Sequence, residues 1–164
     1  MFIALPNAFG DAATNMAIDA ALLAHMPVGL AAFRHYGWLE PATTFGYAQN
    51  YHKVVSELAS GHAPIELAQA SATLTRRMTG GGIVDHRNDW TYALILHSSV
   101  SAASTPATDL YAQIHLAISL SLDKIGIDSR LAPCPRHCEE TPVAKDIPTH
   151  CFVTPAANDV LHPN

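Results

Sequence analysis

The sequence predicts an α+β fold formed by one domain. Short runs of β-branched, aromatic and aliphatic residues alternate with longer stretches in which apolar residues recur at helical spacing. No internal repeat and no linker interrupts this order, and 164 residues are enough to bury a substantial core. We therefore expect residues 1–164 to form a single domain of short strands and helices.

The first part of the chain predicts strands that alternate with helices. Residues 2–5 form an apolar run that Pro6 closes, which indicates a first strand. Asp11 and Thr14 are both candidate N-caps of the helix that follows. Asn15 and Asp19 lie four residues apart on this helix, and the simplest interpretation is a solvated or capping pair. The other predicted elements are strands over residues 30–36 and 43–46 and a helix over residues 51–59.

The second part predicts further strands and the longest helix. A strand over residues 72–77 leads into a glycine-rich segment, and residues 90–97 form a second, strongly patterned strand. Residues 109–125 predict the clearest helix, because apolar side chains recur along one face and a glycine follows. The apolar stripe consists of Leu110, Ile114, Ile118, Leu122 and Ile125. Residues 127–131 predict a last strand, whereas residues 133–148 are rich in proline, cysteine and charge and indicate an irregular segment.

The segment from Leu74 to Leu96 carries the most distinctive chemistry. Arg76 and Arg77 precede three consecutive glycines, Gly80 to Gly82, and His86 follows them. Glycines let a ligand approach the main chain closely, and guanidinium groups suit carboxylate or phosphate. The segment therefore predicts a cradle for an activated acyl group. The alternatives are that the arginines pair with surface carboxylates and that His86 is a hydrogen-bonded core histidine.

The charge and the apolar pattern exclude several functions. The formal net charge of −5 is opposite to the concentrated basic face that nucleic-acid binding requires, so we expect no nucleic-acid partner. The N-terminal residues lack a basic leader, and no apolar run approaches the roughly 20 residues that cross a bilayer. The three cysteines do not suggest a disulfide framework. These features predict a cytoplasmic protein with no membrane partner.

A series of motifs resembles one protein family. In chain order the motifs are Asn15-Met16-Ala17-Ile18-Asp19, Phe33-Arg34, Gly46-Tyr47-Ala48-Gln49, Arg76-Arg77-Met78-Thr79-Gly80-Gly81-Gly82, His86, Asp89-Trp90-Thr91-Tyr92, Cys151-Phe152 and Asp159-Val160. Together they resemble the lipoate–protein ligases and octanoyltransferases, which are related to the biotin–protein ligases. The resemblance covers nearly the whole chain, and its most specific part is the double arginine with the triple glycine and the histidine.

The resemblance implies a fold and a chemistry. The fold is α+β, akin to the catalytic core of class II aminoacyl-tRNA synthetases, with a largely antiparallel mixed sheet flanked by helices. The chemistry is transfer of a lipoyl or octanoyl group to a lysine of a lipoyl-carrier domain. The acyl group would arrive either as a thioester, for example on acyl carrier protein, or as an acyl-adenylate made with ATP and Mg²⁺. Whether lipoate, octanoate or biotin is the substrate stays open.

The resemblance also implies the substrate-binding residues. These are Arg76, Arg77, Thr79, Gly80, Gly81, Gly82 and His86. An acyl transfer needs fixed donors at the carbonyl and an apolar slot for the chain, which agrees with this set.

The sequence departs from the family pattern at its C-terminal side. The family continues with a strand whose lysine anchors the acyl carbonyl, and Lys53, Lys124 and Lys145 lack the flanking residues of that strand. We therefore expect a catalytic domain that is incomplete at its C-terminus or is completed by a second chain. The alternative is a non-catalytic acyl-binding or accessory subunit.

Cys151 is the candidate nucleophile. In one branch of the octanoyltransferases a cysteine in a similar Cys-Phe segment forms the acyl-enzyme thioester, so the resemblance implies this role for Cys151. The alternative is a buried cysteine that packs as a small apolar residue. Zinc held by Cys134, His137, Cys138 and the His150-Cys151 pair is a further alternative. Its ligand spacing is poor, and we predict no bound metal.

Overall fold

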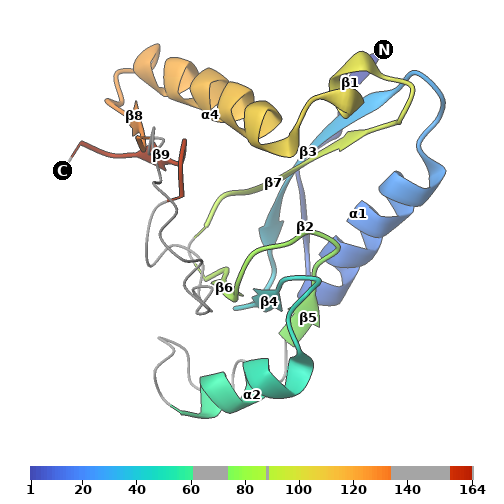
Figure 1. Cartoon of the computed structure of the whole chain (residues 1–164), viewed down its shortest axis with the longest axis vertical. Coiled ribbons are helices and arrows are strands. Elements are labelled where there is room, and N and C mark those ends of the chain that lie inside the picture. The colour runs from blue at the N-terminus through green and yellow to red at the C-terminus, as the bar shows by residue number, and fades with distance from the viewer. Residues whose placement is uncertain (61–73, 88, 134–155, 164) are drawn as a thin grey trace, which may run out of the picture. The chain divides into compact units, whose positions relative to one another are not determined.

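The computed structural model describes residues 1–60, 74–87, 89–133 and 156–163 (Figure 1). These residues fall into two compact units, one that extends to Ala103 and one that begins at Ser104. Each unit has its own secondary structure and is described separately. That residues 1–164 form one domain stays a prediction.

A mixed sheet forms the frame of the first unit. Its central strand is β3 (Ala31–Trp38), which pairs antiparallel with β7 (Thr91–Leu96) along one edge. The short strands β1 (Phe2–Ala4) and β2 (Ala8–Gly10) pair parallel with successive stretches of β3. The predicted strands over residues 2–5, 30–36 and 90–97 are therefore confirmed, each within a few residues.

Helix α1 (Ala12–His25) follows β2, and Asp11 is its N-cap. The Thr14 main-chain N–H donates to the Asp11 carboxylate at 2.7 Å, and this bond lowers the pKa of Asp11. The interpretation of Asn15 as a solvated or capping residue is wrong. Its side chain is completely buried and donates to the carbonyl oxygens of Gly10 and Gly37 at 3.1 and 3.0 Å. Asn15 thus joins α1 to both β2 and β3.

A smaller sheet carries the glycine-rich segment. Strand β4 (Thr43–Phe45) lies between β5 (Leu74–Arg76), which is parallel to it, and β6 (Val84–Asp85), which is antiparallel. Helix α2 (Tyr51–Ala59) has the predicted bounds, and Asn50 is its N-cap. An apolar cluster ties this helix to the small sheet, and it consists of Phe45, Val54, Leu58 and Ile83, with Leu74 packed against them.

The second unit contains the long helix and one short antiparallel pair of strands. Helix α4 (Ala107–Asp123) contains the predicted stripe as far as Leu122, and those side chains are half-buried. Ile125 lies beyond the helix and is 70% exposed. Strands β8 (Arg130–Leu131) and β9 (Val160–Leu161) pair antiparallel. The helix contacts both strands, and its His115 ring is also hydrogen-bonded to the carbonyl oxygen of Asn158, which precedes β9, at 2.9 Å.

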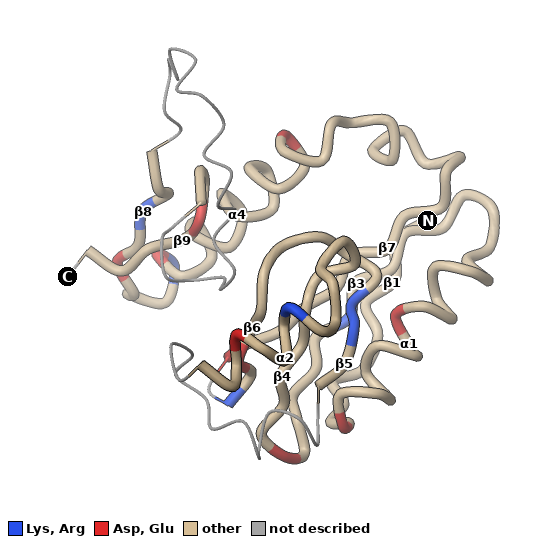
Figure 2. Tube along the Cα trace, turned by 60° about the horizontal axis from the view of Figure 1, so that its bottom comes forward, with Lys and Arg blue, Asp and Glu red and all other residues tan. Residues whose placement is uncertain are grey.

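Charged residues are sparse along the described chain. The Cα trace in Figure 2 shows single acidic and basic positions spread over helices, strands and loops, with a basic stretch at β5. None of the described helices is long and apolar enough to cross a membrane.

Candidate functional site

Two loops of the first unit cross at main-chain contact. The glycine loop, residues 77–82, follows β5, and the segment 46–50 follows β4. The Tyr47 N–H donates to the Thr79 carbonyl at 2.9 Å, and a Cβ placed on Gly46 would lie 2.0 Å from the Gly81 oxygen. Gly81 itself has a φ of 91°, which side chains strongly disfavour. The crossing therefore requires glycine at both positions.

The two arginines hold this crossing together. Arg77 Nη2 donates to the carbonyl oxygens of Gly80 and Gly82 at 3.0 and 2.8 Å. Arg76 Nη1 donates to the carbonyl oxygens of Tyr47 and Gln49 at 2.6 and 2.8 Å. The Arg76 guanidinium also lies 4.5 Å from the centre of the Phe45 ring. Arg77 thus fixes the glycine loop and Arg76 fixes the segment 46–50. Each guanidinium places a positive charge next to the loop that it binds.

The outer side of the glycine loop is open. Thr79, Gly80 and Gly81 are exposed, and a Cβ on Gly80 would meet no atom within 4 Å. Within the described part of the chain, no protein oxygen accepts from the N–H of Gly80 or Gly81. Both N–H groups thus belong to solvent-exposed residues and lack a protein acceptor in this part of the chain.

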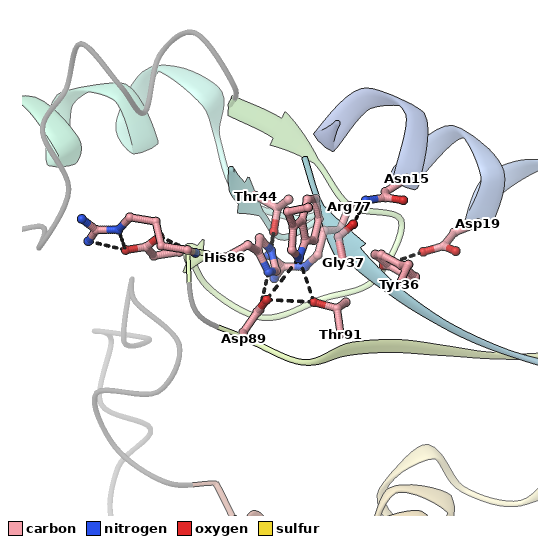
Figure 3. A network of polar contacts seen from close by, with 12 residues as sticks. Asn15, Asp19, Tyr36, Gly37, Thr44, Arg77, His86, Asp89 and Thr91 are labelled. Carbon is pink, nitrogen blue, oxygen red and sulfur yellow. Dashed lines mark hydrogen bonds and ion pairs between the residues drawn. The ribbon is translucent and has the colours of Figure 1, made fainter. Parts of the chain in front are cut away.

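Behind the loop, His86 is buried in a chain of polar contacts (Figure 3). His86 Nε2 lies 2.7 Å from the Thr44 hydroxyl oxygen, which also accepts from Arg77 Nη1 at 2.7 Å. On its other side, His86 Nδ1 contacts an oxygen of the Asp89 carboxylate. The indole of Trp38 stacks on the imidazole, with 4.0 Å between the ring centres.

His86 is a buried, hydrogen-bonded histidine, as one of the two predicted interpretations has it. Its substrate-binding role stays a prediction. The structure brings Arg77, Gly80, Gly82 and His86 into one network, because Thr44 bridges the arginine to the histidine.

A second polar cluster joins α1 to β3. Arg34 is only 2% exposed, and its guanidinium donates to the Asn15 side-chain oxygen at 2.6 Å and to Asp19 at 2.7 Å. The Tyr36 hydroxyl donates to the same Asp19 carboxylate at 3.0 Å. Burial, with the negative charge of Asp19, raises the pKa of Tyr36 above its ordinary value. The side chains of this cluster bind one another, so the cluster fixes helix α1 against strand β3, which also carries Trp38.

Sequence reasoning missed several members of the His86 network. Thr44 was predicted only as part of a strand, Asp89 only as part of a family motif, and Trp38 not at all. The hydroxyl groups of the two threonines in Thr43–Phe45 were the available signal, and they do not distinguish Thr44 from Thr43. The partners of Trp38 lie 51 and 53 residues away at Asp89 and Thr91, so no local pattern indicates them.

The predicted nucleophile Cys151 lies outside the described residues. So do Lys145 and the cysteine and histidine residues of the zinc alternative. Among the residues that the structure does describe, no group of three or more His, Cys, Asp or Glu side chains could hold a metal ion.

Comparison with known proteins identifies the family. A family model described as "Lipoyl protein ligase A/B catalytic domain" matches residues 11–160. Octanoyltransferase LipM of Kyrpidia tusciae is 32% identical over 125 residues, which cover 75% of this chain and 43% of that protein. Octanoyltransferase LipM of Halalkalibacterium halodurans is 31% identical over 125 residues, which cover 74% of this chain and 42% of that protein. The chain thus spans less than half the length of these curated relatives.

A solved structure confirms the predicted fold class. The crystal structure of lipoate-protein ligase A bound with ATP superposes with a TM-score of 0.61 and 19% sequence identity, over 98% of this chain and 56% of that one. The predicted α+β fold of mixed sheets flanked by helices is therefore correct. With the family model matching well over half of its residues, the chain belongs to the family of lipoyl protein ligase A/B catalytic domains.

Proposed function

We propose that this chain binds an activated octanoyl or lipoyl group at the glycine loop and takes part in its transfer to a lysine of a lipoyl-carrier domain. Family membership supports the chemistry, and the names of the LipM relatives favour octanoyl transfer from a thioester. We further propose that the reaction takes place in the cytoplasm, which is in keeping with the absence of a disulfide framework from the sequence.

The observation that carries this proposal is the arrangement of the glycine loop. Arg77 binds the carbonyl oxygens of Gly80 and Gly82, whereas the N–H groups of Gly80 and Gly81 have no acceptor within the described residues. Main-chain N–H groups held in advance are the donors that stabilise a developing oxyanion in acyl transfer. The bare Cα of Gly80 would let the acyl carbonyl approach them closely.

In the transferase version, Cys151 is the proposed acyl acceptor. Its thiolate would attack the thioester carbonyl of the octanoyl carrier and release the carrier thiol. The lysine amine of the lipoyl-carrier domain would then attack the new thioester and release Cys151. The N–H groups of the glycine loop would bind the carbonyl oxygen in both steps.

In the ligase version, the acyl group would be activated with ATP. The solved relative bound with ATP has the same fold, and the donors of this site suit a phosphate-bearing group. Arg76 and Arg77 would supply positive charge, and the N–H groups of the loop would bind phosphate oxygens. Mg²⁺ would accompany the ATP phosphates in this version.

Intact-mass measurement distinguishes the two versions. The chain is incubated with an octanoyl thioester of acyl carrier protein, and the transferase version predicts an octanoyl adduct that Cys151→Ser abolishes. Pyrophosphate release that depends on octanoate and ATP, without an adduct, supports the ligase version. Neither adduct nor pyrophosphate, with no octanoyl transfer to a lipoyl-carrier domain, contradicts the proposal of an enzyme.

A second candidate is a non-catalytic acyl-binding subunit completed by another chain. The positions of the described lysines favour it, because Lys53 lies in helix α2 and Lys124 caps helix α4, so neither lies on a strand of the kind that carries the family's anchoring lysine. This candidate predicts binding of lipoate or of an octanoyl-adenylate analogue in calorimetry without turnover. It also predicts co-purification with a second polypeptide, whose addition restores octanoyl transfer.

A further inference from the structure

We propose that Asp89 is a positioning residue that sets the tautomer of His86 and, through Thr44, the placement of Arg77 and the glycine loop. Hydrogen bonds from Trp38 and Thr91 orient the Asp89 carboxylate toward His86. The catalytic consequence of this inference rests on the proposed acyl-binding function, whereas the tautomer itself does not.

The Asp89 carboxylate is oriented by two donors on one of its oxygens. Its Oδ1 accepts from the indole N–H of Trp38 at 3.1 Å and from the Thr91 hydroxyl at 3.1 Å. The indole nitrogen is only ever a donor, and it also donates to the Thr91 oxygen at 3.0 Å, so the Thr91 hydrogen is directed at Asp89. The other oxygen, Oδ2, is left to face His86 Nδ1.

The two ends of the hydrogen-bond network from Arg77 to Asp89 determine which atom donates in each of its bonds. A guanidinium can only donate and an ionised carboxylate can only accept. Arg77 therefore donates to the Thr44 oxygen, the Thr44 hydroxyl donates to His86 Nε2, and His86 Nδ1–H donates to Asp89. This order assigns the Nδ1–H tautomer to His86.

The opposite tautomer leaves buried groups unpaired. With the proton on Nε2, both His86 and Arg77 would donate to the Thr44 oxygen, and the Thr44 hydrogen would lose its acceptor. Thr44 is completely buried, so water cannot replace that acceptor. The bare lone pair of Nδ1 would also face the Asp89 carboxylate, and two acceptors in contact repel each other.

At its other end, the hydrogen-bond network reaches the glycine loop through Arg77. The guanidinium that donates to Thr44 through Nη1 binds the carbonyl oxygens of Gly80 and Gly82 through Nη2. If the Thr44 hydroxyl no longer donates to His86, the Arg77 guanidinium that is bound to Thr44 shifts. The carbonyl oxygens of Gly80 and Gly82 shift with it. Asp89 is thus connected to the proposed acyl site without touching it.

The test is the variant Asp89→Asn, for which the structure predicts a specific change. The amide oxygen must take the Oδ1 position, because Trp38 and Thr91 both donate there. The amide NH₂ then occupies the Oδ2 position and donates to His86 Nδ1. The histidine is forced into the Nε2–H tautomer, which is the arrangement that leaves the Thr44 hydrogen without an acceptor.

Imidazole ¹H–¹⁵N correlation spectra of the full chain, recorded without any acyl donor, report the tautomer directly. We expect the Nδ1–H pattern for His86 in the parent chain and the Nε2–H pattern in Asp89→Asn. The matched control is Asp85→Asn, which removes one carboxylate from the same segment, where Asp85 binds the exposed Arg87. We expect this control to keep the Nδ1–H pattern.

An Nε2–H pattern in the parent chain overturns the proposal, and that measurement needs no variant to fold. An unchanged Nδ1–H pattern in folded Asp89→Asn also overturns it.

If the chain transfers octanoyl groups, we expect Asp89→Asn to lower kcat/KM about 10- to 100-fold, the usual effect of misplacing a reacting group by about an ångström. Asp85→Asn should leave kcat/KM within about twofold, and an equal loss in both variants overturns the positioning role. A chain that transfers no octanoyl group contradicts the proposed function, while the tautomer result still decides this inference.

Discussion

Replacing Gly46 by alanine tests the crossing on which the candidate site depends. The added Cβ would lie 2.0 Å from the Gly81 carbonyl oxygen and 3.0 Å from its carbon, whereas ordinary contact begins at 3.4 Å. The three nearest atoms all belong to the main chain, so no side-chain rotation relieves the clash. The two loops must therefore separate by more than about 1 Å, which requires the backbone to shift.

That separation breaks contacts that hold the glycine loop. The bond from the Tyr47 N–H to the Thr79 carbonyl, 2.9 Å long, spans the crossing directly. Arg76, which binds the Tyr47 and Gln49 carbonyls, is displaced with the loop. Overpacking costs about 1–3 kcal/mol and a lost hydrogen bond about 1 kcal/mol, so we expect Gly46→Ala to lower the free energy of unfolding by about 2–4 kcal/mol.

The matched control is Gly80→Ala in the other loop. A Cβ on Gly80 meets nothing within 4 Å, so we expect its free energy of unfolding to stay within about 0.5 kcal/mol of the parent chain. Urea unfolding followed by tryptophan fluorescence measures both variants, because Trp38 and Trp90 lie in the same unit as the crossing. Equal stability of Gly46→Ala and Gly80→Ala would refute the steric reasoning.

Three further predictions concern the packing that supports the site. Arg34→Leu leaves Asn15 and Asp19 without their buried donor, and we expect a loss of about 3–5 kcal/mol in urea unfolding; a loss below 1 kcal/mol contradicts the account of this cluster. Leu58→Ala opens a cavity under β4 and should cost about 2–5 kcal/mol by the same measurement, while the m-value stays unchanged. The raised pKa of Tyr36 predicts stability that is complete below pH 10, the ordinary tyrosine value, and is lost as the pH rises through the higher pKa of the folded state. Tyr36→Phe should flatten this alkaline loss in a pH series of melting temperatures, and an unchanged series contradicts the assignment.

The local elements of this protein were largely predictable from its sequence. Helix α2 has the predicted bounds, because Val54 and Leu58 recur at helical spacing and face the apolar cluster. Strand β7 was equally clear from its continuous apolar and aromatic residues. Strand β6 has only two residues, Val84 and Asp85, and was not predicted, because its pairing with β4 and not its own pattern defines it.

The candidate site was predictable only in part, since most of its contacts join distant segments. The arginines and glycines of residues 76–82 were found from their local pattern, and the structure adds that the arginines bind the loops themselves. Thr44 and His86 are 42 residues apart, so their contact has no local signature. The error at Asn15 has the same origin, because its acceptor at Gly37 is 22 residues away on β3. Helical spacing shows which residues share a face but does not show what that face meets.

Binding of an octanoyl ligand by the glycine loop tests the central claim most directly. We propose calorimetry of the full chain with a non-hydrolysable amide analogue of the octanoyl thioester, with Gly80→Ala as the variant and Asp85→Asn as the control. The added methyl of Gly80→Ala would occupy the open side of the loop without disturbing the fold. The account predicts saturable binding by the parent chain and by the control, and binding about tenfold or more weaker in Gly80→Ala. Equal affinity of the parent chain and Gly80→Ala, or no binding by any of the three, would contradict it.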